Sequence, residues 1–297
     1  LGDFYVEIKN NFIDSCLGSD IFAYEDFSGV GIAYFWKGTI KIINNTFVSG
    51  SRYAILLAEN GAFFEISGNT IMSNFGGIFL SGVSGIRGII KDNLIAYNSD
   101  AGLKLRLFNG ANLTAFNNYI AKNRRGISYA ELAQSLRSNT VYNDICRNVE
   151  YDMTSAPAGE GVILNGTYNY WGVTSKEAIE DRIYHFNDDF SLREVIYTPY
   201  LNASTRAYIF GYLIDKLSGL PIGNATLTAI GPSHFSTYSN ASGYFNLEGL
   251  LPGEYEITIS KEGYQAVRWF VSLGEAQAFS TNVLLSCLLY TSPSPRD

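Results

Sequence analysis

The feature that most constrains this chain is a motif, Asn-x-apolar, that returns about every 24 residues through its first two thirds. An apolar residue lies three positions before several of these asparagines, as at Ile42, Ile66 and Ile90. Short apolar runs at this spacing, without helical periodicity, are typical of a solenoid in which each repeat forms one coil. The asparagines of the motif are Asn11, Asn45, Asn69, Asn93, Asn118, Asn139 and Asn169.

A second apolar position follows nine or ten residues after most of the asparagines, at Ile21, Ile55, Ile78, Leu103, Ile127 and Val149. We expect like residues of successive coils to stack, so that these apolar positions fill the interior. Inward asparagine side chains at a bend can bond both the next asparagine and the main chain, which satisfies buried donors. The sequence therefore predicts a structural ladder of Asn45, Asn69, Asn93, Asn118 and Asn139. A second ladder is predicted at Asn74, Asn98 and Asn123.

The period also admits a leucine-rich repeat, which has a similar length and its own asparagine ladder. That repeat needs L-x-x-L-x-L before the asparagine, whereas this chain has I-x-x-N-x-I, and we reject it. Three short strands per coil then predict a parallel β-helix over residues 1–203. The longer first interval indicates an insertion near Ala23–Gly38, which is either a binding overhang or an extra strand pair on the coil.

A different pattern occupies residues 206–286. Strand-like runs at Tyr208–Ile214, Ala225–Ile230, Gly243–Leu247 and Tyr255–Ser260 alternate with turn signals such as Gly231-Pro232. Strands at this spacing predict a small antiparallel β-sandwich. The fold class is therefore all-β, a right-handed parallel β-helix followed by a sandwich.

The last residues, 287–297, read CLLYTSPSPRD. This peptide resembles the translation of a common sequencing adapter, so we expect it to be an artefactual tail and exclude it from the fold. Two cysteines then remain, Cys16 and Cys146, several repeats apart. Because that separation is too long for a disulfide in a solenoid, we expect both to be small buried apolar residues.

The pattern I-x-x-N-x-I-x-x-N-x-x-G-I, closed by Asn169–Gly172 (NYWG), resembles right-handed parallel β-helix proteins of the pectin-lyase-like superfamily. It is similar in particular to periplasmic and surface proteins of the nitrous oxide reductase copper-maturation type. The resemblance implies a short helix over Lys176–Tyr184 with Ser175 as its N-cap. It also implies that Trp171 seals the apolar end of the last coil.

The second pattern also resembles a known family. The pieces G-x-x-x-D-x-x-x-G-x-P-I, S-x-x-x-G-x-F, L-x-P-G-x-Y and K-x-G-Y, the last ending at Tyr264, resemble the carboxypeptidase regulatory-like domain. Domains of that family are usually stalks or accessory modules. The resemblance therefore implies a non-catalytic role for residues 206–286.

Composition excludes some classes of function. The net charge of −7 argues against nucleic acid, which requires a basic surface. No apolar run is long enough to span a bilayer. Neither His185 nor His234 has partners at metal-ligand spacing, and two Met and two His make a copper site unconvincing. We therefore expect no metal, no cofactor and no catalytic residue.

One group of charges is the best candidate for a ligand site. Lys104 and Arg106 share one face of a predicted strand, and Arg124-Arg125 follow one coil later. Together with Asp92 they would form a basic strip that could hold an anionic glycan. The alternative is a set of solvated charges that keep flat sheets from aggregating.

These observations favour a non-catalytic extracellular or cell-surface module, with a periplasmic location as an alternative, that binds polysaccharide or cell-wall glycan or mediates adhesion. The competing hypothesis is a β-helix lyase, hydrolase or epimerase that acts on acidic glycans, which would require carboxylates and cations converging in one groove. We expect a monomer in either case.

Overall fold

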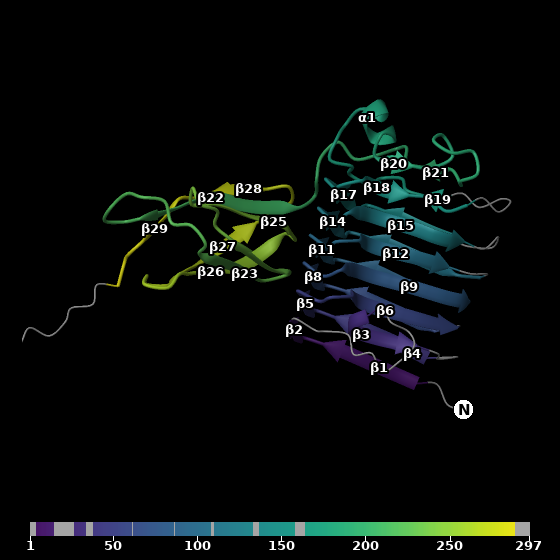
Figure 1. Cartoon of the computed structure of the whole chain (residues 1–297), viewed down its shortest axis with the longest axis horizontal. Coiled ribbons are helices and arrows are strands. Elements are labelled where there is room, and N and C mark those ends of the chain that lie inside the picture. The colour runs from purple at the N-terminus through teal and green to yellow at the C-terminus, as the bar shows by residue number, and fades with distance from the viewer. Residues whose placement is uncertain are drawn as a thin grey trace, which may run out of the picture. The chain divides into compact units, whose positions relative to one another are not determined.

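The computed structural model describes residues 4–14, 27–33, 38–60, 62–85, 87–107, 110–132, 137–157 and 164–288. Internal contacts divide the chain into two compact units, residues 1–205 and residues 206–297 (Figure 1). The two units are described separately. Of the insertion expected at residues 23–38, residues 27–33 form a strand of the coil that pairs with residues 53–58, and residues 23–26 and 34–37 lie outside the described residues, as do Cys16 and Ile21.

The first unit is a parallel β-solenoid built from three sheets, and each of its first six coils contributes one strand to each sheet. Sheet 1 contains, in order, β1 (Phe4–Lys9), β4 (Gly38–Ile43), β7 (Phe63–Ser67), β10 (Arg87–Lys91), β13 (Asn112–Phe116), β16 (Arg137–Val141), β19 (Leu164–Asn165) and β21 (Val195–Ile196). Sheet 2 contains β2 (Phe12–Asp14), β5 (Thr46–Val48), β8 (Thr70–Met72), β11 (Leu94–Ala96), β14 (Tyr119–Ala121) and β17 (Asp144–Cys146). Sheet 3 contains β3 (Phe27–Ala33), β6 (Tyr53–Asn60), β9 (Gly76–Ser84), β12 (Ala101–Leu107), β15 (Arg125–Leu132), β18 (Tyr151–Thr154) and β20 (Ile183–Tyr184).

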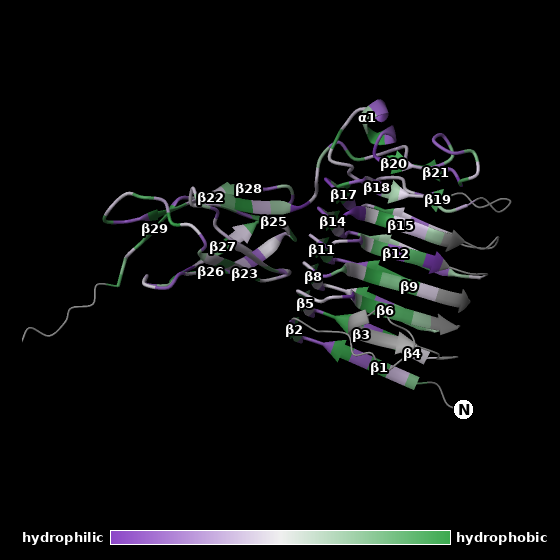
Figure 2. Ribbon diagram, viewed as in Figure 1, coloured by the Kyte–Doolittle hydropathy of each residue, from purple (hydrophilic) through white to green (hydrophobic). Residues whose placement is uncertain are grey.

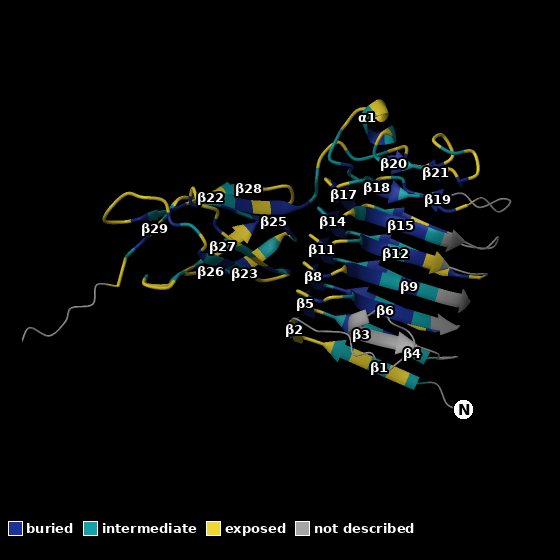
Figure 3. Cartoon of the chain, in the orientation of Figure 1, coloured by how far each residue is buried: buried dark blue, intermediate teal, exposed yellow. Residues whose placement is uncertain are grey.

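Apolar side chains stack in columns inside the solenoid because successive strands pair in register. In sheet 1, Ile42, Ile66 and Ile90 lie side by side and are fully buried. Each such side chain contributes about 1.5–3 kcal/mol through burial. Figure 3 shows the buried positions following one another along β6, β9, β12 and β15, and Figure 2 shows apolar segments on β6 and β9. The matching column of sheet 3 is Ile55, Ile78, Leu103, Ile127, Met153 and Ile183.

An asparagine ladder runs along the bend between sheets 1 and 2. At each rung the main-chain N–H and the side-chain Nδ2 of one asparagine both donate to Oδ1 of the asparagine in the next coil. Asn69 donates to Asn93 at 2.9 and 3.0 Å, for example, and its Nδ2 also reaches the carbonyl of Ile42 at 2.8 Å. We call this set the first ladder: Asn11, Asn45, Asn69, Asn93, Asn118, Asn143 and Asn169.

The prediction that Asn139 belongs to this ladder is wrong, because Asn143 occupies the rung. Asn118 donates to Asn143 Oδ1 at 2.9 Å, whereas Asn139 is exposed on β16. The segment N-T-V at Asn139 matches the motif locally, but only a coil of 25 residues brings the amide back to its stacking position. The same shift along the chain moves the second apolar position of this coil from Val149, as predicted, to Met153. Val149 is 76% exposed, and Met153 fills the interior column.

A second ladder runs along the bend between sheets 2 and 3 and ends on a carboxylate. Its members are Asn74, Asn98, Asn123, Asn148 and Asp152. Asp152 Oδ1 accepts from the N–H and Nδ2 of Asn148 at 3.1 and 2.8 Å. Arg182 closes the end, with Nε donating to Asp152 Oδ2 at 2.9 Å. The Arg182 guanidinium thereby partners a carboxylate whose side chain is fully buried.

The C-terminal end of the solenoid is closed by Trp171 and by α1 (Lys176–Glu180). Trp171 is 1% exposed and belongs to the apolar core together with Ile179 of α1. The side chain of Ser175 caps the helix by accepting from the N–H of Ala178 at 3.2 Å. The helix is shorter than the resemblance implied, since β20 follows at Ile183–Tyr184. In the part of the chain that the structure describes, no helix is long and apolar enough to cross a membrane.

The second unit is a small β-sandwich of two sheets. The first contains β25 (Tyr244–Leu250), β22 (Ala207–Asp215) and β28 (Ala278–Ser280), with β29 (Val283–Leu285) also on β22. The second contains β24 (His234–Tyr238), β23 (Thr226–Ile230), β26 (Gly253–Ser260) and β27 (Val267–Leu273). Pairing is antiparallel except that β28 and β29 run parallel to β22. Of the predicted tail, Cys287 bridges Tyr264 through the main chain, and residues 289–297 lie outside the described part.

Candidate functional site

The positively charged residues selected from the sequence lie on and beside the outer face of sheet 3. Lys104 and Arg106 alternate with the buried Leu103 and Leu105 of β12 and therefore point away from the core. Main-chain bonds bring the bend residues of successive coils side by side. The N–H of Asp100 donates to Phe75, that of Arg124 to Asp100, and that of Glu150 to Arg124. We call the resulting surface the corner strip: Phe75, Asp100, Lys104, Arg124, Arg125 and Glu150.

The two arginines of the corner strip share one carboxylate. Arg124 Nε lies 2.7 Å from Glu150 Oε1, and Arg125 Nε lies 2.8 Å from Glu150 Oε2. The hydrogen bond from Arg125, followed by that from Arg124, lowers the pKa of Glu150. Two guanidinium groups and one carboxylate leave a net charge of +1, so the group is a partly compensated network rather than a free basic surface, and Glu150 is a member that the sequence reasoning missed.

Lys104 rests on aromatic rings at the other end of the strip. Its Nζ lies 5.2 Å from the ring centroid of Phe79, 5.6 Å from that of Tyr53, and 3.9 Å from Asp100 Oδ2. Tyr53 is 2% exposed, and its hydroxyl donates to Asp100 Oδ2 at 2.5 Å. Phe75 packs edge-on against Tyr53, with ring centroids 5.7 Å apart, and remains 45% exposed. The accessible ring of Phe75 is thus linked through Tyr53 to a cation, Lys104, and a carboxylate, Asp100.

Two of the selected residues lie apart from these contacts. Asp92 is at the bend between sheets 1 and 2, where it has a left-handed φ of 58° and accepts from Asn117 Nδ2 at 2.6 Å. It therefore does not join Lys104, because the two residues belong to different sides of the coil. Arg106 is exposed two residues beyond Lys104 on β12, beside Ser81 of β9.

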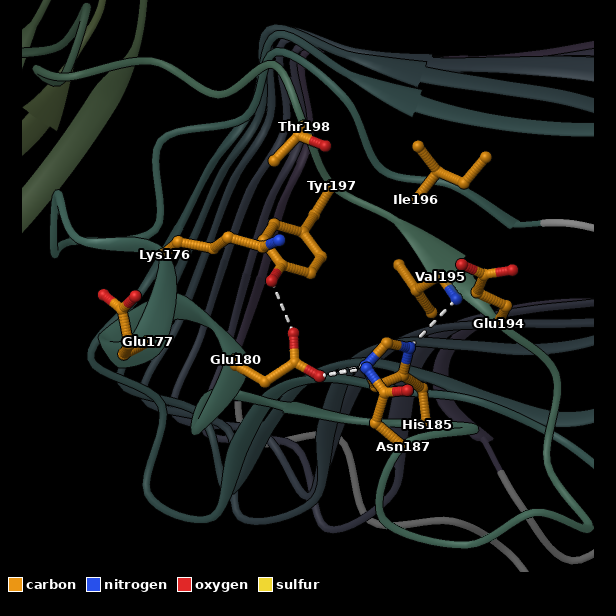
Figure 4. A pocket seen from close by; sticks show the side chains of 10 residues that line it. All are labelled: Lys176, Glu177, Glu180, His185, Asn187, Glu194, Val195, Ile196, Tyr197 and Thr198. Carbon is orange, nitrogen blue, oxygen red and sulfur yellow. Dashed lines mark hydrogen bonds and ion pairs between the residues drawn. The ribbon is translucent and has the colours of Figure 1, made fainter.

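A pocket of about 480 Å³ lies in the cap of the solenoid, and we call it the cap pocket (Figure 4). Its polar centre is Glu180 of α1. Glu180 Oε1 accepts from His185 Nε2 at 2.8 Å and from Asn187 Nδ2 at 2.5 Å, and Oε2 accepts from the hydroxyl of Tyr197 at 2.5 Å. The lining residues are Lys176, Glu177, Glu180, His185, Asn187, Glu194, Val195, Ile196, Tyr197 and Thr198.

The hydrogen bonds fix the state of His185. Its Nδ1 accepts from the N–H of Val195 at 3.1 Å, so in this arrangement the ring proton is on Nε2 and points to Glu180. Burial raises the pKa of Glu180, but the hydrogen bonds from Asn187, Tyr197 and His185 outweigh burial and leave the pKa below its usual value. Burial and the bond to Glu180 raise the pKa of Tyr197.

This arrangement connects three elements more readily than it activates a nucleophile. Both nitrogens of His185 are engaged, Nε2 with Glu180 and Nδ1 with the N–H of Val195. Among the residues that the structure describes, no three His, Cys, Asp or Glu side chains form a group that could hold a metal. The cap pocket was not foreseen, since its residues come from residues 176–198, which do not follow the repeat.

Two family comparisons agree with this architecture. The family described as right handed beta helix region matches residues 2–170, which is more than half of the chain. The carboxypeptidase regulatory-like domain family matches residues 208–286. The chain therefore belongs to the right-handed β-helix family and carries a carboxypeptidase regulatory-like domain after the solenoid. No curated protein matches the sequence significantly.

Solved structures show weaker likenesses. A streptococcal ancillary pilin is 14% identical over 32% of this chain and 36% of its own, with a TM-score of 0.26. BcpA, the major pilin subunit of Bacillus cereus, is 17% identical over 33% of this chain and 32% of its own, with a TM-score of 0.24. 3-Chlorocatechol 1,2-dioxygenase from Rhodococcus opacus is 12% identical over 29% of this chain and 61% of its own, with a TM-score of 0.24. The match spans less than two thirds of each of these chains, and at such scores we draw no functional conclusion.

Proposed function

We propose that this chain is a non-catalytic extracellular or cell-surface module that binds carbohydrate along the corner strip. A β-helix joined to a carboxypeptidase regulatory-like domain has the architecture of a surface or structural module. The finer assignment is supported by one observation. Phe75, 45% exposed, packs against Tyr53, whose ring also contacts Lys104 and whose hydroxyl bonds Asp100, and the Arg124–Glu150 pair continues the row into the next coils.

The chemistry of this surface suits a sugar. A partly exposed aromatic ring can cover the apolar face of a saccharide, while the carboxylate and guanidinium groups offer acceptors and donors to its hydroxyls. Coils about 4.8 Å apart place Phe75, Asp100, Arg124 and Glu150 in a row, along which an extended polysaccharide could lie. Because Glu150 neutralises much of the charge of the two arginines, retention should depend less on salt than binding to a purely basic strip would.

The test measures retention on immobilised acidic and neutral polysaccharides, together with the release of soluble product from the same incubation. We expect Phe75→Ala to reduce retention about fivefold to tenfold, which corresponds to the loss of one aromatic contact worth about 1 kcal/mol. Phe190→Ala is the matched control, because Phe190 is 79% exposed on the same unit but lies outside the strip.

Retention without product, reduced by Phe75→Ala and unchanged by Phe190→Ala, would support the proposal. Equal retention of all three proteins would contradict the assignment to the corner strip. Release of product would contradict a non-catalytic module and favour a polysaccharide lyase or hydrolase.

A further inference from the structure

The edge strand β27 of the sandwich has an unusual surface. It is the last strand of its sheet, and among the residues that the structure describes its outer main-chain edge pairs with no other strand. Phe270 is 73% exposed, while Val267, Trp269 and Val271 are only half-buried. Proteins usually protect such edges with proline, lysine or a bulge. Val267–Leu273 (VRWFVSL) contains no proline or lysine, and its pairing with β26 shows no bulge.

The sequence of this strand allows two copies of it to pair. In antiparallel pairing of two β27 strands about Trp269, Val267 faces Val271 of the second copy and Arg268 faces its Phe270. Arg268, the charged residue of the strand, is then opposite an aromatic ring and not opposite Arg268 of the second copy, so like charges do not meet. Arg268 is held on the outer face because its Nε lies 3.1 Å from Oε1 of Glu256 on the neighbouring strand β26. Glu256 is also the residue of β26 that lies directly opposite Phe270.

We propose, in place of the monomer expected from the sequence, that β27 is a self-association strand that pairs antiparallel, about Trp269, with β27 of a second copy of this chain. Pairing gives hydrogen-bond partners to the main-chain groups at the free edge of both copies. It also places each exposed Phe270 against Arg268 of the other copy. The same patch serves both subunits, as a twofold interface requires. This interface is independent of carbohydrate binding, since it uses no residue of the corner strip.

The test is a charge exchange at the predicted contact, with the mass of the full chain measured in solution by light scattering over a range of concentrations. We expect a concentration-dependent dimer. Phe270→Lys places a lysine opposite Arg268 of the other copy and should weaken dimerisation at least about tenfold. Adding Arg268→Glu should restore the dimer, because each glutamate then faces a lysine. Tyr238→Lys is the control, on the exposed surface of the opposite edge strand β24.

Several outcomes would overturn the proposal. A monomeric wild-type chain at every concentration would do so, as would a Phe270→Lys variant that dimerises normally. A double variant that stays monomeric while its melting temperature is unchanged would reject the pairing about Trp269. Hydrogen exchange provides a second measurement without any variant, because amide protons on the outer edge of β27 should exchange faster on dilution.

Discussion

At the scale of the residue, one side-chain amide oxygen at each rung of the first ladder accepts hydrogen bonds from two donors of the preceding coil. Asn118 Oδ1 accepts from the N–H of Asn93 at 3.1 Å and from its Nδ2 at 2.9 Å, all in the buried interior. A chain of such bonds strengthens its members cooperatively, since each amide that accepts also donates. The side chain thus acts as a part of the main-chain fold rather than as a ligand.

Replacing a rung should therefore cost far more than replacing an exposed asparagine. We expect Asn118→Ala to lower the free energy of unfolding by about 1–3 kcal/mol, because the buried N–H of Asn93 loses its acceptor. The measurement is denaturant unfolding of the full chain. Asn139→Ala is the control, since Asn139 is exposed, and it should change stability by less than about 0.5 kcal/mol. Equal losses in the two variants would refute the ladder's contribution.

The end of the second ladder allows a sharper test. Burial raises the pKa of Asp152, more than the bonds from Arg182 lower it. Arg182→Leu leaves this carboxylate without its cation and should cost about 3–5 kcal/mol at neutral pH. Because a raised pKa means that ionisation disfavours the folded state, the deficit should shrink as the pH falls and Asp152 becomes protonated.

Asp152→Asn in the Arg182→Leu background is the matched rescue. An amide at this position can still accept from Asn148, as the asparagines of the earlier rungs do, and it carries no charge. We expect it to recover most of the lost stability at neutral pH. Failure of this rescue would show that Arg182 acts mainly through its packing.

At the scale of the element, the cluster around Glu180 attaches α1 to β21 and to Tyr197, the residue that follows it. Its bonds reach Tyr197 directly and Val195 through His185. Since the pKa of Glu180 is lowered in the folded state, the ionised carboxylate stabilises the fold above its usual pKa of about 4.3. That contribution is lost as the pH falls through the lowered folded value.

Glu180→Gln should therefore lower the urea midpoint at neutral pH, and the difference from wild type should close at acid pH. The measurement is a series of urea unfolding curves from neutral to acid pH. Glu177→Gln is the control on the same helix, where the side chain is exposed. A difference that persists unchanged at acid pH would contradict the stabilising role of the ionised carboxylate.

The elements also show what the sequence could and could not predict. The solenoid was predictable because stacking repeats the same environment in every coil, so that Ile42, Ile66 and Ile90 recur at a fixed spacing. The rung at Asn143 was misassigned to Asn139 because both segments match the motif locally. Only the length of the preceding coil distinguishes them.

The candidate site was less predictable than the fold. Alternation along a strand places Lys104 outward, but the neighbours Phe75, Asp100 and Glu150 come from bends of other coils. Which bend residues lie side by side depends on the register between coils, and that register is fixed by the ladders rather than by local sequence. The cap pocket has no repeat at all to indicate its contacts.

At the scale of the whole molecule, the two units differ in how their strand edges are satisfied. The solenoid pairs successive coils and closes its C-terminal end with Trp171 and α1, while β1, β2 and β3 are the first strands of their sheets and have no preceding coil among the described strands. The sandwich leaves β27 as an unpaired edge among the described strands. If two copies meet there, each assembly carries two corner strips. A weak carbohydrate site would then gain avidity on a multivalent surface.

The direction of the ladders has a consequence for how the chain is made. In the first ladder, each asparagine from Asn11 to Asn143 donates to an oxygen of the coil that follows it, as Asn45 does to Asn69 and Asn69 to Asn93. A ribosome releases the N-terminal coil first, before that acceptor exists. Each of these coils therefore completes its bonds of the first ladder only after its successor has emerged, and the series ends at Asn169, which donates to the carbonyls of Thr140 and Gly166 instead.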